Sequence, residues 1–551
     1  MADIETNRVE TIESEELRRE VLDPHEIAVV DVREGDRYAS GHISVAVELP
    51  LSEIELRAAE LLPRGGLRIV VTDDDGISLA PAAAARLQAI GYQNVRVLAG
   101  GLRSWKAAGN ELITGLNSLS KALGESVERQ YSAPKIDAQK LWDLLDAGQD
   151  VVVLDTRPLE EFNHISIPGG IAAPGAELLH RVFDAVPSPT TRIVVNCAGR
   201  TRAIIGAQAL LNAGIPNPVV SLENGTAAWM LAGLEPARGE TAQANRPSAE
   251  GLLKAREAAA RVAGRFGVQT IDRAQLDTFT SERTDRTLYL FDVRTTEEFE
   301  AGHLHGAISA PGGQLVQATD RYVGVRQARI VLLDDDDLVR STITASWLFQ
   351  LGLDDVYIYP ATVADRTETG PVAKRILGDL DSGETVDPTD LPPLIASGAV
   401  LLDLEPAAPY FRERLYIPGS IVARRSTLAS HLDEVPGTGP IVLTSSDGAL
   451  ARLAATDLVW SSKRRVLALH GGTAGWIAAG LGEPGRGLDQ LALNPSEALP
   501  RLPTLEQRRI TLAAYVHWGD LIVEQLDRDG LVQFRLPLAA QHRARSGGQR
   551  R

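Results

Sequence analysis

Short apolar runs, each ending at a polar residue, recur along the whole chain. Four of them end in an Asp-x-Arg triplet or a close relative of it, which begins at Asp31, Asp155, Asp292 and Asp403. A second apolar run follows each of these and leads into a polar loop, at Asp73, Cys197, Asp334 and Ser445. Short apolar runs bounded by polar loops are typical of buried β-strands.

The spacing between the two runs is constant. It is 42 positions from the first landmark residue to the second in all four cases. A separation that recurs four times indicates internal repeats. We therefore expect four copies of one structural unit.

Between the strands the pattern becomes helical, as in the segments 81–87 and 203–211, and a glycine and a new apolar run follow. Strands that alternate with helices predict an α/β fold, in which a mainly parallel sheet carries helices on both faces. A late Gly-x-x-x-Trp pattern completes three copies, at Trp105, Trp229 and Trp476. The third copy, around 357–360, lacks this pattern.

These landmarks divide the chain into four domains, which we place at 1–112, 132–239, 269–372 and 373–486. Charged, helix-prone linkers at 113–131 and 240–268 separate the first domain from the second and the second from the third. A C-terminal extension at 487–551 contains a predicted helix at 505–526 and a basic tail from Gln541 to Arg551. The composition of the tail predicts disorder.

Composition narrows the classes of function. Of the 551 residues, 44% are apolar and 23% are charged, as in ordinary globular proteins. The net charge of −17 repels phosphate backbones, so nucleic acid is not an expected partner. No apolar run reaches the roughly 18 residues that span a bilayer, and the acidic segment 1–10 does not resemble a signal peptide. We expect a cytoplasmic protein without a membrane partner.

Cys197 is the one cysteine of the sequence, which excludes an internal disulfide and a zinc site built on several thiolates. It stands where a strand ends and a helix begins, the edge at which parallel sheets bind ligands. Backbone N–H groups in such a loop, together with the N-terminus of the helix, attract an anion. Because Arg200 and Arg202 follow in the same loop, we expect a lowered pKa for the Cys197 thiol. No metal and no cofactor are expected.

The loop Cys197-Ala198-Gly199-Arg200-Thr201-Arg202 resembles the six-residue active-site loop of rhodanese domains. The flanking landmarks agree with this resemblance, since Asp155-Thr156-Arg157, Glu160-Glu161-Phe162 and the pattern from Gly225 to Trp229 follow the order of that family. The four copies together resemble the four-domain bacterial thiosulfate sulfurtransferases. The resemblance implies four tandem rhodanese-like domains.

The resemblance also implies a mechanism. Cys197 would take a sulfane sulfur from thiosulfate or another donor and pass it, as a persulfide, to cyanide, a small thiol or a protein thiol. The backbone amides of Ala198, Gly199, Arg200, Thr201 and Arg202 would hold the persulfide. The side chains of Arg200 and Arg202 would bind the sulfonate end of the donor, with Asp155 and Arg157 as structural supports behind the loop.

The other three copies carry Asp73, Asp334 and Ser445 at the position of Cys197, and none of these forms a persulfide. We expect these copies to be inactive scaffold. The acidic runs at 73–75 and 334–337 allow a site for a hard cation as an alternative, but solvated loops are favoured over it. Glu405 stands where the other copies have arginine, which predicts that the fourth copy lacks the Asp–Arg pair.

Three alternative functions stay open at this point. Phosphatases and arsenate reductases of related architecture place an arginine six positions after their cysteine, where this chain has Ala203, and are disfavoured. A sulfurtransferase that uses 3-mercaptopyruvate or a persulfide as its donor is a second possibility. A non-enzymatic sulfur relay or docking platform is the third.

Overall fold

The computed structural model describes residues 9–537 apart from 379, 381–382, 406–413, 488–489 and 496–503. The basic tail predicted from Gln541 to Arg551 lies outside the described residues. Among the described helices, none has both the length and the apolar character needed to cross a membrane.

The first two domains contain parallel five-stranded sheets of the same strand order. In domain 1 the order is β1 (Thr11–Ile12), β5 (Asn94–Leu98), β4 (Arg68–Thr72), β2 (Ile27–Asp31) and β3 (Ala46–Glu48). In domain 2 it is β6 (Lys135–Ile136), β10 (Val219–Leu222), β9 (Arg192–Asn196), β7 (Val151–Asp155) and β8 (Ile171–Ala172).

The third and fourth domains repeat this order. Domain 3 has β11 (Gln269–Thr270), β16 (Val356–Pro360), β15 (Arg329–Asp334), β12 (Leu288–Asp292) and β14 (Ile308–Ser309). Domain 4 has β18 (Glu384–Val386), β23 (Val466–Leu469), β22 (Ile441–Thr444), β19 (Val400–Asp403), β21 (Ile421–Val422) and a sixth strand, β25 (Leu491–Ala492). Strand β25 lies beyond the predicted domain boundary at 486, so the start of the C-terminal extension belongs to the sheet of domain 4. Short antiparallel pairs flank these two sheets, β13 (His303–Leu304) with β17 (Arg366–Glu368) and β20 (Leu415–Tyr416) with β24 (Gly485–Arg486). The shared order confirms four tandem α/β units.

Helices connect the strands of each sheet. Domain 1 has α1 (Ser14–Leu22), α2 (Gly35–Ser40), α3 (Ile54–Leu61), α4 (Ala80–Ala89) and α5 (Gly101–Ala107), and domain 2 has α7 (Ala138–Asp146), α8 (Leu159–His164), α9 (Glu177–Ala185), α10 (Thr201–Ala213) and α11 (Gly225–Leu231). Domain 3 has α13 (Arg273–Ser281), α14 (Thr296–Ala301), α15 (Gly312–Gln317), α16 (Thr319–Tyr322) and α17 (Val339–Gln350). Domain 4 has α18 (Leu391–Ala396), α19 (Arg425–Leu428), α20 (Ala449–Leu458) and α21 (Gly472–Ala478).

The predicted landmarks fall at defined places in the sheets. The aspartate that begins the Asp-x-Arg triplet or its relative ends the equivalent strand in each copy, β2, β7, β12 or β19. The Gly-x-x-x-Trp pattern forms α5, α11 and α21, whereas the third copy has a short 3-10 helix, Val363–Asp365, at that place. Strands such as Val151–Asp155 lie between helices and are mostly buried, which fits their apolar sequence.

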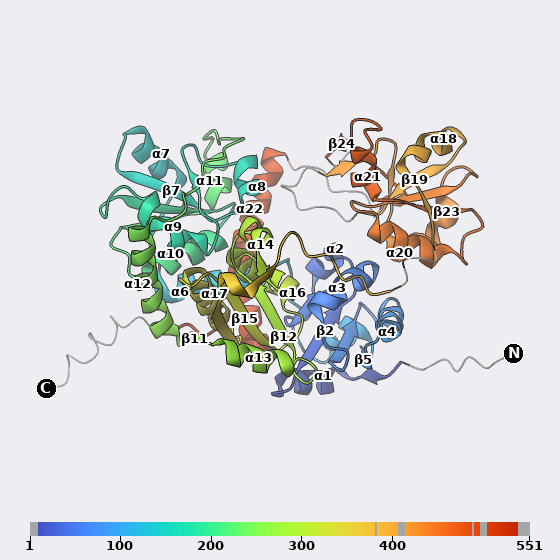
Figure 1. Cartoon of the computed structure of the whole chain (residues 1–551), viewed down its shortest axis with the longest axis horizontal. Coiled ribbons are helices and arrows are strands. Elements are labelled where there is room, and N and C mark those ends of the chain that lie inside the picture. Colours follow the sequence, from blue (N-terminus) through green and yellow to red (C-terminus); the bar gives the residue numbers. More distant parts are fainter. Residues whose placement is uncertain are drawn as a thin grey trace.

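Among the residues that the structure describes, three further helices lie outside the repeats. The linkers contain α6 (Ser118–Tyr131) and α12 (Ala249–Phe266), and the C-terminal extension forms α22 (Leu505–Asp529). Helix α22 packs along α6 and touches α11, so the C-terminal part of the chain returns to domain 2 (Figure 1). Its position brings distant sequence to the edge of the sheet where Cys197 lies.

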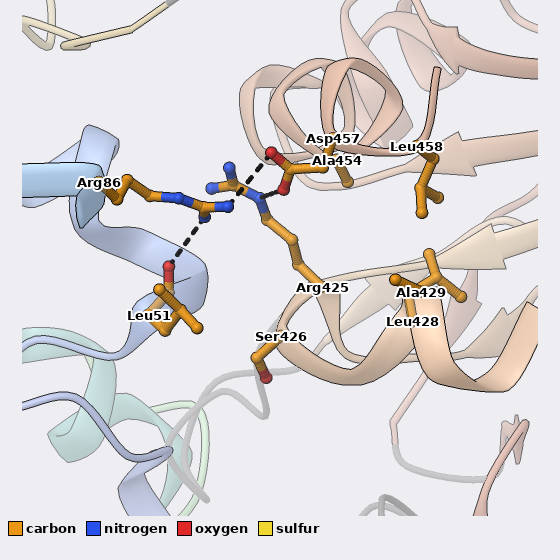
Figure 2. Close-up of a pocket in the computed structure, with 9 residues that line it drawn as sticks. All are labelled: Leu51, Arg86, Arg425, Ser426, Leu428, Ala429, Ala454, Asp457 and Leu458. Carbon is orange, nitrogen blue, oxygen red and sulfur yellow. Dashed lines mark hydrogen bonds and ion pairs between the residues drawn. The ribbon is translucent and has the colours of Figure 1, made fainter. Parts of the chain in front are cut away.

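The domains differ in how they share apolar cores. Buried residues of domains 1, 2 and 3 form one continuous cluster with α6 and α12. Domain 4 has two clusters of its own and lies to one side of the molecule (Figure 1). Figure 2 shows the polar contact that joins it to domain 1, in which Arg425 and Arg86 both reach Asp457. Arg425 also donates two hydrogen bonds, of 2.8 and 3.0 Å, to the Glu55 carboxylate.

Candidate active site

Cys197 follows directly after β9, and α10 begins four positions later at Thr201. Its side chain is buried, and the backbone N–H groups of Gly199 and Ala203 are directed at the sulfur. The start of α11 supports the loop, because the N–H of Thr226 donates to the Cys197 carbonyl at 2.9 Å. The loop is therefore a cradle of N–H groups at a helix N-terminus. Gly199 belongs to the amides predicted from the sequence, whereas Ala203 lies one position beyond them.

Gly225 shows why a glycine stands beside this loop. Its φ is +56°, in the left-handed region that glycine adopts readily. A Cβ atom at this position would collide with the carbonyl oxygens of Cys197 and Gly199. The late Gly-x-x-x-Trp pattern thus has a local role, which is to let α11 approach the backbone of the cysteine loop.

Asp155 and Arg157 form a buried ion pair beneath the cradle. Arg157 donates from Nε to Asp155 Oδ1 at 2.8 Å and from Nη2 to Oδ2 at 2.7 Å. Asn196, the last residue of β9, donates to Asp155 Oδ2 at 2.7 Å and to Thr226 Oγ1 at 3.1 Å. These bonds connect β7, β9 and α11 immediately behind Cys197.

The two loop arginines already have carboxylate partners. Arg200 pairs with Glu125 at 2.9 Å and with Glu128, both on α6. Arg202 makes two hydrogen bonds of 2.8 Å to the carboxylate of Glu161 on α8. Both arginines line the cavity at Cys197, but their charges are balanced by glutamates that the sequence did not connect with the site.

The predicted lowering of the cysteine pKa is wrong for this arrangement. Burial raises the pKa of the Cys197 thiol, while Arg202 and the N–H groups of Ala203 and Gly199 act in the opposite direction. The arginines and the helix N-terminus are visible in the sequence, whereas the loss of water around the sulfur, which raises the pKa, is not. Asp155, at the end of β7, also favours the neutral thiol.

A cavity of about 470 Å³ opens beside Cys197. Its lining comes from the cysteine loop, from α11, from Gln317 of domain 3, and from Thr511, Leu512 and Tyr515 of α22. The hydroxyl of Tyr515 lies 3.2 Å from that of Thr201. The sequence predicts a helix at 505–526 but carries no signal that this helix reaches the cysteine loop.

The carboxylate at the equivalent position of domain 1 occupies its own cradle. Asp73 is buried, and its two oxygens accept hydrogen bonds from the N–H groups of 75, 76, 79 and 80. In domain 4, Ser445 Oγ accepts the N–H of Ala451 at 3.3 Å. The anion-binding geometry persists in domain 1, but a side chain of the protein fills it.

The acidic run of domain 3 is also occupied by internal partners. Asp334 is buried and accepts from Arg340 Nε at 2.9 Å and from the N–H of Ser341 at 2.8 Å. Arg340, itself buried, further bonds Glu177 of domain 2 at 3.0 Å and Glu298 at 2.6 Å. The expectation of a solvated acidic loop is therefore wrong here, because the run belongs to a buried ion network between domains 2 and 3.

The fourth copy retains an Asp–Arg pair, contrary to the expectation from Glu405. Arg414 lies 2.8 Å from Asp403 and is buried. It also donates to the backbone carbonyl of Glu405 at 2.6 Å. Arg414, which follows Glu405 by nine positions, thus replaces the missing arginine, and the triplet pattern does not reveal it.

No metal site is apparent in the part of the chain that the structure describes. No group of three or more His, Cys, Asp or Glu side chains there is arranged to hold an ion. The carboxylates of the acidic runs bond backbone N–H groups and arginines instead, as at Asp73 and Asp334.

Comparisons with known proteins agree with the repeat and the loop. A family model for the rhodanese-like domain matches residues 13–108, 137–232 and 276–361, just over half of the chain. The fourth sheet lies outside these matches although its strands have the same order. None of the curated proteins compared gives a significant match.

Solved structures extend the comparison to the whole molecule. A thiosulfate sulfurtransferase from Pseudomonas aeruginosa is 42% identical, and the match covers 96% of this chain and 100% of that chain with a TM-score of 0.88. A rhodanese-like domain from Anabaena sp. is 28% identical over 19% of this chain and 79% of that chain, with a TM-score of 0.18. The chain belongs to the rhodanese-like family of sulfurtransferases.

Proposed function

We propose that this protein transfers sulfane sulfur from thiosulfate to a thiophilic acceptor, such as cyanide or a thiol, through a persulfide on Cys197. The position of Cys197 carries the proposal: a thiol lies in a cradle of N–H groups at the N-terminus of α10 and opens into a cavity. The solved relative that covers the whole chain is described as a thiosulfate sulfurtransferase, which supports thiosulfate as the donor.

The proposed chemistry has two steps. The Cys197 thiolate attacks the outer sulfur of thiosulfate, a new S–S bond forms, and the S–S bond of thiosulfate breaks as sulfite leaves with the electron pair. The acceptor then attacks the outer sulfur of the persulfide, and the Cys197 thiolate is restored. Splitting one transfer into two displacements is the advantage of nucleophilic catalysis.

The N–H groups and Arg202 favour the charged forms of the sulfur that these steps need, and they act against the burial that raises the pKa of the thiol. The thiolate and the persulfide are both anions, and preorganised N–H donors in a site with little water stabilise such charge. Arg202 favours the thiolate electrostatically, although it is paired with Glu161. Asp155, Arg157 and Asn196 hold the strand ends so that these N–H groups stay directed at the sulfur.

The arginines of the cysteine loop are not placed to bind a phosphate, so phosphate transfer remains disfavoured. Ala203 stands at the position where the related phosphatases carry their phosphate-binding arginine. Arg202, one position earlier, gives both hydrogen bonds of its fork to Glu161. A phosphate would have to displace that carboxylate before the guanidinium could bind it.

The test is the intact mass of the purified protein after incubation with thiosulfate, with and without cyanide. We expect a gain of about 32 Da, the mass of one sulfur, which cyanide removes and which Cys197→Ser does not acquire. Sulfur bound by Cys197→Ser would contradict the mechanism. A mass gain with 3-mercaptopyruvate or a persulfide, but not with thiosulfate, would mean that thiosulfate is not the donor. No mass gain with any of the three would favour the docking platform.

A further inference from the structure

One side of the Cys197 cavity consists mainly of apolar side chains. Leu512 and Tyr515 of α22 lie three positions apart, which places them on the same face of the helix. Ala227, Met230 and Leu231 of α11 continue this surface. We call these five side chains the apolar wall, and its members from α22 are absent from the sequence repeat.

Helix α22 is fixed firmly enough to act as part of a binding site. The Tyr515 ring lies 3.9 Å from Nζ of the buried Lys121, which in turn bonds Glu125 at 2.6 Å. Further along the helix, Ile522 and Leu526 are buried in a cluster with Ile113 and Ala122 of the preceding linker region. The wall is therefore held by apolar packing and by a cation–π contact.

The charges around the cavity are balanced rather than strongly positive. Arg200 is paired with Glu125 and Glu128, and Arg202 with Glu161. A dianion such as thiosulfate gains less from these paired arginines than their presence in the loop sequence predicts. The N–H cradle remains able to bind the charged end of a donor with a single negative charge.

The size of the cavity also favours a donor larger than thiosulfate. Its volume of about 470 Å³ falls among sites for organic ligands, which are roughly 300–1,000 Å³, and thiosulfate is far smaller. A donor that carries an apolar organic group would fill the space between the cradle and the apolar wall. Burial of that group would add binding free energy that thiosulfate does not have.

We propose that the apolar wall makes this site prefer sulfane-sulfur donors that carry an apolar organic group, and that Leu512 and Tyr515 determine this preference. An aryl thiosulfonate is the simplest probe of this class. The inference rests on the proposed function, because it assumes that Cys197 accepts the sulfur. The anionic end of the donor lies on the cradle and its ring lies against Leu512 and Tyr515.

The step balances in the same way as the reaction with thiosulfate. The Cys197 thiolate attacks the terminal sulfur of the thiosulfonate, and a new S–S bond forms. The S–S bond of the donor breaks, and its electron pair leaves with an aryl sulfinate. Two single negative charges enter the step, on the thiolate and the thiosulfonate, and two leave it, on the persulfide and the sulfinate.

The experiment compares kcat/KM for benzenethiosulfonate with kcat/KM for thiosulfate, with cyanide as the acceptor in both cases. We expect the full chain to prefer benzenethiosulfonate and Leu512→Ala to reduce that preference about tenfold, since losing an apolar contact of this size changes selectivity by roughly 10- to 200-fold. Leu521→Ala is the matched control, because Leu521 lies on the same helix, is exposed and does not line the cavity.

A second variant tests the charge balance independently of the wall. Glu161→Gln frees Arg202 and should shift the ratio towards thiosulfate. An unchanged ratio in folded Leu512→Ala, or a full-length protein that prefers thiosulfate, overturns this inference while leaving the proposed function intact. Absence of turnover with both donors, or sulfur bound by Cys197→Ser, overturns the proposed function and this inference with it.

Discussion

The loops after β9 and β4 occupy the same place in their sheets, yet one presents a thiol to a cavity and the other fills its own cradle. At Cys197, N–H groups surround a sulfur atom beside open space. At Asp73, N–H groups of four residues bind the two oxygens of the side chain. One anion-binding geometry therefore holds a thiol beside a cavity in domain 2 and binds a carboxylate of the protein itself in domain 1.

Domain 3 shows a third use of the same position. Asp334 does not bind a full ring of N–H groups but shares Arg340 with the carboxylates of Glu177 and Glu298. Burial raises the pKa of Asp334 to about 6, although Arg340 opposes this. The degenerate loop of domain 3 thus joins its domain to domain 2.

The largest expected effect comes from converting the active loop into the domain 1 type. Cys197→Asp should reduce sulfur transfer on the order of 10⁴-fold or more, as the loss of a covalent nucleophile does. The new carboxylate can accept the N–H groups of the cradle, so the melting temperature should change little. Steady-state turnover and thermal unfolding measure the two effects.

The reciprocal substitution, which places a thiol in the cradle of domain 1, is the control for Cys197→Asp. Asp73→Cys in a Cys197→Ser background should restore no turnover, because the cavity lined by α11 and α22 lies beside domain 2. Recovery of sulfur transfer would mean that a thiol in any of the cradles is sufficient.

Removing the buried guanidinium of Arg340 in domain 3 should give the largest loss of stability. Arg340→Met removes the guanidinium that the buried carboxylates of Glu177 and Asp334 share. This should cost about 3–5 kcal/mol, although Glu177 keeps its ion pair with Arg181. Urea unfolding followed by tryptophan fluorescence reports this, since Trp347 is buried on the same helix. Arg246→Met removes an exposed arginine that lies 3.8 Å from Glu298 and should change stability by less than about 1 kcal/mol. Equal effects of the two variants would contradict the buried network.

The cradle of domain 1 should contribute less to the free energy of unfolding than the Arg340 network does. Asp73→Ala leaves buried N–H donors without an acceptor and should lower the free energy of unfolding by about 2–3 kcal/mol. Asp73→Ser, which imitates Ser445 of domain 4, should lose less because its hydroxyl still accepts a hydrogen bond. Urea unfolding of both variants checks this order, and a neutral effect of Asp73→Ala would show that water satisfies the loop.

A pH dependence of stability is expected at the contact between domains 2 and 3. Burial alone lowers the pKa of His180, but Asp337 and Glu177 outweigh it and raise the pKa to about 9. A folded pKa above the unfolded value of 6.5 means that the charged form stabilises the fold below pH 6.5. This contribution is lost as the pH rises through 9.

His180→Gln therefore should flatten the fall in melting temperature between pH 6.5 and 9. His25→Gln, at an exposed position, is the matched control. Parallel pH profiles for the wild type and His180→Gln would argue against a charged histidine at this contact.

Part of this molecule follows from the sequence alone. Strands and loops depend on residues that are close together in the sequence, so local patterns predict them. Such patterns give the repeat spacing, the loop that begins at Cys197, and the strand ends at Asp31, Asp155, Asp292 and Asp403. The same patterns predict the four α/β domains and the position of the cysteine at the edge of a parallel sheet.

Only the tertiary structure decided what surrounds that cysteine. Glu125, Glu161 and Tyr515 come from three separate helices, and their contacts with the loop depend on how α6, α8 and α22 pack. The pKa of the Cys197 thiol likewise depends on burial, which sums over all packed elements. Long-range contacts of this kind produce no recurring pattern of residues in the sequence. They determine which charges and which apolar surfaces a substrate meets.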